Sequence, residues 1–129
     1  MARTAVLGFP RIGPERELKA ALEAHWAGRT PVDEVEAVAR RLRAAHLDAG
    51  RDAGIDVLPV GDFALYDHVL DTAAMAGLVA GRHRGLDTFA AARGADGVRP
   101  LELTKWFDTN YHYLVPELAD DAPFELDAG

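Results

Sequence analysis

Two short segments of the 129-residue chain combine cations with groups that could hold an anionic ligand. The first begins with Arg11 and continues at an expected helix start with Arg16, Glu17, Leu18 and Lys19. Residues three apart project on neighbouring lines of one helix face, so Arg16 and Lys19 lie together. Two cations at this end oppose the helix dipole, and they are useful there if an anion docks on them. The local alternative is that Lys19 pairs with Glu23 at i,i+4 while Arg16 is solvated.

The second segment runs from Thr104 to Tyr113 and packs aromatic rings, one cation, amides and hydroxyls into ten residues. Such a mixture suits a concave site for a flat ligand with an anionic end. The alternative is an aromatic core strand whose polar edge lies in water. In an unbroken strand Lys105 and Asn110 point to opposite faces, so both reach one ligand only across a turn or bulge.

Other kinds of reactive site find little support in the sequence. The chain has no cysteine, which excludes a thiol nucleophile or a thiolate metal site. Paired carboxylates, a glycine-rich phosphate loop and a nucleophile elbow are missing, so no catalytic residue is predicted. The histidines share no metal-ligand spacing and are interpreted as structural or surface groups: His25, His46, His68, His83 and His112.

The elements that must position these segments alternate between strand and helix. Strands are expected at residues 4–9, 55–60 and 101–118, from short apolar or alternating runs bounded by Gly and Pro. Helices are expected at 15–27, at 31–53 with Thr30 as N-cap, and between an Asp62 cap and Gly77. Residues 81–100 read as irregular, with a helical turn or two at 86–92.

This order predicts an α/β fold with a parallel sheet covered by helices. Three strands do not close a barrel, which needs eight strands and about 250 residues. The sequence therefore reads as the opening of a larger α/β domain, with exposed sheet edges that favour self-association or marginal stability.

Composition and charge exclude several classes of protein. Hydrophobic residues make up 49% and charged residues 27%, which is typical of a globular domain. The net charge of −7 is concentrated at the end, where five acids follow residue 116, and residues 119–129 are expected to be an acidic tail or loop. No basic field indicates nucleic-acid binding, and no apolar run is long enough for a membrane span or signal peptide, so a cytoplasmic location is the default.

Four blocks, in order, resemble the N-terminal part of cobalamin-independent methionine synthase: residues 8–13, Arg16–Lys19, residues 58–70, and residues 104–117. The resemblance covers nearly the whole chain but only the opening fraction of the family's length. It implies that residues 1–118 are part of an N-terminal (βα)8 barrel, a TIM barrel that is incomplete here.

The resemblance also implies an activity. These enzymes transfer a methyl group from 5-methyltetrahydropteroyltriglutamate to homocysteine, forming methionine, with zinc and without cobalamin. It assigns Arg16, Glu17, Leu18 and Lys19 to a folate-binding helix, Lys105 to the polyglutamate contact, and Asn110 to folate binding. A triglutamate tail carries several carboxylates, which gives the cations at the helix start a physical purpose.

The family's zinc ligands belong to a C-terminal barrel that this sequence lacks, so this chain alone is expected to be inactive. The hypotheses left open are a fragment or split enzyme whose C-terminal barrel is a separate partner, a non-catalytic binding or interaction module, and a remnant that folds poorly.

Overall fold

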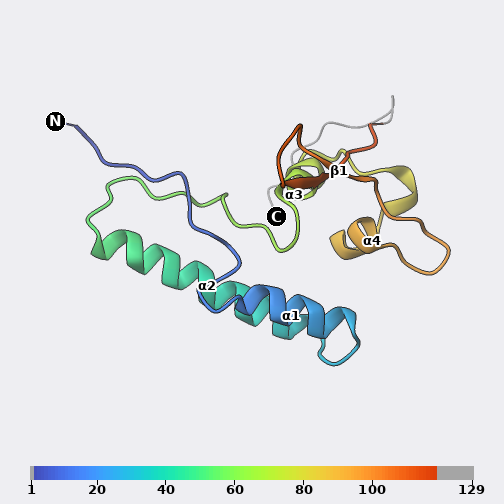
Figure 1. Ribbon diagram of the computed structural model, residues 1–129, viewed down its shortest axis with the longest axis horizontal. Helices are drawn as coiled ribbons and strands as arrows, with labels where there is room; N and C mark the ends of the chain where they lie inside the picture. The colour runs from blue at the N-terminus through green and yellow to red at the C-terminus, as the bar shows by residue number, and fades with distance from the viewer. Residues whose placement is uncertain (1, 119–129) are drawn as a thin grey trace. The chain divides into compact units, whose positions relative to one another are not determined.

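The chain divides into two compact units, one up to Leu65 and the other from Tyr66 onward. The computed structural model describes residues 2–118 (Figure 1). The predicted acidic tail, residues 119–129, lies outside the described residues and stays a prediction.

The first unit contains two helices, α1 (Glu17–Trp26) and α2 (Val32–Asp52), which run side by side (Figure 1). Their buried side chains recur at helical spacing: Leu18 and Leu22 on α1, Val35, Ala39 and Leu42 on α2. Both helices were predicted within about two residues of their ends. The Thr30 cap was wrong, because Pro31 takes the cap position and no side chain caps α2.

The predicted strands at 4–9 and 55–60 are parallel neighbours, but they pair through one bridge only, between Ala5 and Val57. Side-chain acceptors replace the rest of the ladder. The Asp56 carboxylate accepts the Thr4 N–H at 2.7 Å, and the Asp62 carboxylate accepts the Phe9 N–H at 3.1 Å. Pro59, in the second segment, has no N–H to donate. The parallel direction is thus confirmed, whereas the length of the strands was wrong.

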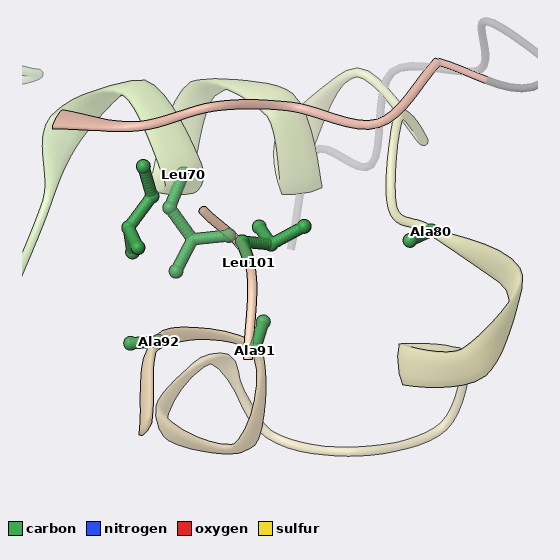
Figure 2. Close-up of a cluster of buried hydrophobic side chains, with 6 residues drawn as sticks. Leu70, Ala80, Ala91, Ala92 and Leu101 are labelled. Atoms are coloured by element: carbon green, nitrogen blue, oxygen red, sulfur yellow. The ribbon is translucent and has the colours of Figure 1, made fainter. Parts of the chain in front are cut away.

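The second unit is built from short elements around an apolar cluster. These are α3 (His68–Met75), the 3₁₀ turn η1 (Gly81–His83), α4 (Thr88–Arg93), β1 (Leu103–Lys105) and β2 (His112–Leu114). Figure 2 shows Leu70 of α3 and Leu101 side by side, above Ala91 and Ala92 of α4. Helix α4 confirms the helical turn predicted at 86–92. The third predicted helix starts later than expected, because Asp67 caps it in place of Asp62.

The single strand predicted over 101–118 is a hairpin. Strands β1 and β2 pair antiparallel, with Leu103 opposite Leu114 and Lys105 opposite His112. The turn between them places Phe107 in the left-handed region, with φ 49°, and the Thr109 hydroxyl donates to the Trp106 carbonyl at 2.6 Å. The only named sheet among residues 2–118 is therefore antiparallel, which corrects the prediction that the segment 101–118 adds one strand to a parallel sheet. The chain is a mixed helix and sheet structure compatible with an incomplete α/β domain.

An ion pair closes the open end of the hairpin. Both carboxylate oxygens of Glu117 accept from the Arg82 guanidinium, one of them at 2.6 Å. The same guanidinium donates to the carbonyls of Arg99 and Pro100, just before β1. The hydrogen bonds and charge of Arg82 lower the pKa of the Glu117 carboxyl from its ordinary value of 4.5. The pair therefore ties the segments that enter and leave the hairpin.

Acid should weaken this tie. A carboxyl whose pKa is lowered by folding stabilises the fold above its unfolded pKa, and that stabilisation is lost as the pH falls through the folded value. We expect the melting temperature to drop below about pH 4.5, and Glu117→Gln to flatten this part of the profile. Thermal melts by circular dichroism from pH 3 to pH 7 measure both. Arg82→Met should give the same profile as Glu117→Gln, and a Glu117→Gln profile as steep as the wild type's would contradict the role of the pair.

Candidate functional site

The start of α1 is held by a tight backbone loop. Arg16 lies in the left-handed region, with φ 61°, and its N–H donates to the Gly13 carbonyl at 3.0 Å. The Leu18 N–H donates to the Ile12 carbonyl at 3.1 Å, which links the first turn of the helix to the preceding loop. Arg11 also helps to hold this loop, because its guanidinium donates to the Leu65 carbonyl at 2.9 Å.

The four predicted residues of this segment divide into two kinds. The Leu18 side chain is 0% exposed and belongs to the core. The Glu17 carboxylate turns back and accepts the Glu15 N–H at 3.1 Å, close to Gly13. Arg16 and Lys19 are exposed. The anchored pair thus fixes the backbone from which the two cations project.

Lys19 has a partner on its own helix. Its ammonium lies 2.5 Å from the Glu23 carboxylate, so the local pairing considered for Lys19 is confirmed. The hydrogen bond and charge of Lys19 lower the pKa of Glu23, and the charges of Arg16 and Arg29 add to this effect. Three cations therefore act on the Glu23 carboxylate, two of them from the start of α1.

In the second unit, Lys105 ends β1 and Asn110 lies in the turn before β2, both exposed. The turn that the sequence required between them is present. Its backbone is ordered by the Trp106 N–H, which donates to the Tyr111 carbonyl at 2.9 Å. The Trp106 ring meets the Tyr113 ring edge-on, with 5.4 Å between centroids, so the hairpin presents a polar turn beside packed aromatic rings.

Sequence reasoning missed the neighbours that hold this turn. His68 was interpreted as a structural or surface residue, yet its Nδ1 lies 2.9 Å from the Tyr111 hydroxyl. Asp67 is 6% exposed and its Oδ2 accepts the Leu114 N–H at 2.6 Å. The adjacent Asp67 and His68 were the sequence feature that could have revealed these contacts. Side chains of adjacent residues diverge within a helix, but Asp67 is the N-cap and has an extended backbone, so both side chains reach the Tyr111 hydroxyl.

A cavity of about 100 Å³ in the first unit was also not foreseen. The Phe9 and His46 rings stack in its wall, with 5.0 Å between centroids. Its remaining lining residues are Arg43, Leu47, Pro59, Val60 and Asp62. None of the predicted binding residues lines it.

The described residues 2–118 bring no three histidine, aspartate or glutamate side chains together as metal ligands. These residues therefore do not fit a zinc site. The family resemblance places the zinc ligands in a C-terminal barrel and not among these residues. In the same range of residues, no helix is both long and apolar enough to cross a membrane.

The fold is compatible with an incomplete α/β domain, and each unit presents a segment with exposed cationic side chains, Arg16 and Lys19 in the first and Lys105 in the second. A family model described as "Cobalamin-independent synthase, N-terminal domain" matches residues 3–129. The chain belongs to this family.

Curated relatives agree with this assignment. A protein of Rhodococcus jostii is 56% identical over 95% of this chain, and one of Streptomyces coelicolor is 54% identical over 98%. A protein of Nitratidesulfovibrio vulgaris is 54% identical over 98%. All three are named 5-methyltetrahydropteroyltriglutamate–homocysteine methyltransferase. The chain spans only 17% to 18% of the length of these relatives.

Gly13 gives a direct test of how the cationic helix start is held. Its φ is +85°, and a Cβ there would lie 2.0 Å from the Glu17 carboxylate. Gly13→Ala should lower the free energy of unfolding by about 2 kcal/mol, from left-handed strain plus displacement of Glu17. Urea unfolding followed by circular dichroism measures the loss.

Gly28→Ala is the matched control, because Gly28 has φ +69° and nothing within 4 Å of a new Cβ. It should show the strain alone, about 1 kcal/mol. Equal losses at the two positions would mean that the Glu17 contact adds nothing.

Proposed function

We propose that this chain is part of a methyltransferase that moves a methyl group from 5-methyltetrahydropteroyltriglutamate to homocysteine, and that it contributes to binding the folate's polyglutamate tail. The names of the relatives, at more than 50% identity, support the reaction. Because the chain matches only about 17% of their length, the chemistry at sulfur is assigned to the rest of the polypeptide, and this chain alone is inactive.

The observation that carries the binding role is the exposure of Arg16 and Lys19 beside two anchored neighbours, Glu17 and Leu18. A cation on a fixed backbone loses less freedom when it binds than one on a flexible loop. A triglutamate carries several carboxylates, which pair with guanidinium and ammonium groups in charge-assisted hydrogen bonds. In this proposal Glu23 holds the Lys19 ammonium until a ligand carboxylate replaces it.

The hairpin contributes separately. Lys105 supplies a charge, and Asn110 supplies an amide that can both donate and accept. No described residue forms a hydrogen bond or ion pair with the Lys105 ammonium. The Asn110 side-chain amide likewise has no hydrogen-bond partner among residues 2–118, so no contact within that range would have to break before either side chain met an oxygen-rich ligand.

We also propose that the domain is the opening part of a (βα)8 barrel. The parallel Ala5–Val57 bridge, with two helices in the intervening chain, supports a βα-type connection. One face of this strand pair is uncovered: Leu7 is 99% exposed and Val57 is 41% exposed. Parallel sheets are normally buried on both faces. Further strands of the longer polypeptide would cover this face, and a C-terminal barrel would supply the reaction.

The length of the glutamate tail tests the binding role. Two further carboxylates should strengthen binding about fivefold, since each exposed ion pair contributes about 0.5 kcal/mol. We expect 5-methyltetrahydropteroyltriglutamate to bind the chain more tightly than the monoglutamate in calorimetric titrations. Lys19→Glu should erase this preference, whereas Arg40→Glu, an exposed cation on α2, should keep it. Equal affinity of the wild type for both folates would refute the proposal.

The internal competitor of the ligand gives a second test. Glu23→Gln removes the carboxylate that pairs with Lys19, so triglutamate should bind about two- to threefold more tightly. Glu36→Gln is the control, because Glu36 forms an i,i+4 pair with Arg40 on α2. Unchanged or weaker binding in the Glu23→Gln variant would show that Lys19 does not meet the ligand.

A further inference from the structure

We propose that Asp67 is a positioning residue of the ligand-binding hairpin, and that its buried carboxylate sets the placement of Lys105 and Asn110. This inference rests on the proposed folate-binding function. It goes further in assigning control of the hairpin to a side chain on another element, at the start of α3.

The two oxygens of Asp67 hold two different elements. Oδ1 accepts the Val69 N–H at 3.0 Å and caps α3. Oδ2 accepts the Leu114 N–H of β2 at 2.6 Å. Leu114 is buried and pairs with Leu103 across the hairpin. A buried carboxylate with two backbone donors is a strong, directional tie between helix and strand.

A second contact from the same corner reaches the turn. The Tyr111 hydroxyl lies 2.9 Å from His68 Nδ1 and 3.5 Å from Asp67 Oδ1. Tyr111 follows Asn110 directly, and its carbonyl accepts the Trp106 N–H next to Lys105. The start of α3 therefore contacts the hairpin at two points that follow Asn110, at Tyr111 in the turn and at Leu114 in β2.

Asp87 shows what a cap without this additional role looks like. It caps α4 in the same unit, and its Oδ1 accepts the Ala90 N–H at 2.9 Å. No described residue of the hairpin bonds to it. The single amide oxygen of Asn can still accept one N–H, so Asp87→Asn and Asp67→Asn can each keep a helix cap. Only Asp67→Asn also puts an NH₂ group where a second backbone N–H, that of Leu114, needs an acceptor.

The test compares these two variants in the 129-residue chain. Calorimetry measures affinity for 5-methyltetrahydropteroyltriglutamate and for the monoglutamate, and amide hydrogen exchange by NMR reports the Trp106 N–H in the turn. We expect Asp67→Asn to weaken triglutamate binding about fourfold, to weaken monoglutamate binding less than twofold, and to speed exchange at Trp106 about tenfold. Asp87→Asn should change each quantity less than twofold. A fold that is merely less stable would lose both ligands together.

Tyr111→Phe is the milder variant should Asp67→Asn fail to fold. It keeps the ring and removes only the hydroxyl that meets His68, and we expect about threefold weaker triglutamate binding. The positioning role would be overturned if Asp67→Asn had the same affinity and exchange rate as Asp87→Asn. If Asp67→Asn does not fold, unchanged triglutamate affinity in Tyr111→Phe would overturn it. A wild-type chain without triglutamate preference would instead contradict the proposed function.

Discussion

Positive charge at the start of a helix is repelled by the helix dipole, and the first unit depends on how its fold tolerates that repulsion. The apolar contact between α1 and α2 buries Leu18 and Leu22, which fixes α1 whatever charge it carries. The Glu17 carboxylate, at the same end of the helix, accepts the Glu15 N–H. The side chains of Arg16 and Lys19 can therefore stay exposed, because α1 does not need them in its core.

In the second unit, the contacts that hold the hairpin are made by other residues than Lys105 and Asn110. They are the apolar cluster, the Arg82–Glu117 ion pair and the Asp67 carboxylate. The exposed turn carries little of the packing, since Phe107 is 79% exposed. Its order comes from hydrogen bonds to α3 and within the turn. The conformation of such a turn is sensitive to substitutions at the residues of α3 that hydrogen-bond to it.

The helices could be predicted from the sequence because helix signals are local. Leu18 and Leu22, spaced four apart, and the stops at Gly28 and Gly54 give α1 and α2 nearly their observed ends. The strands could not, because the alternation from Phe107 to Val115 is the same for one long strand as for a hairpin, and only the left-handed Phe107 distinguishes them. From the sequence alone, Asp62 and Asp67 are equally good candidates for the N-cap of α3. Tertiary contacts select Asp67, since the Asp62 carboxylate accepts the Phe9 N–H instead.

The local sequence pattern did not predict the candidate binding residues. At Lys19 it favoured the ion pair with Glu23, which is observed, and only the resemblance to a family pointed to a ligand.

The most direct test of the central claim is an NMR titration of the labelled chain with 5-methyltetrahydropteroyltriglutamate, followed by amide and side-chain shifts. The account predicts that the largest shifts fall on Arg16, Lys19, Lys105 and Asn110. Shifts centred on the Phe9–His46 cavity, with these four residues unchanged, would contradict it.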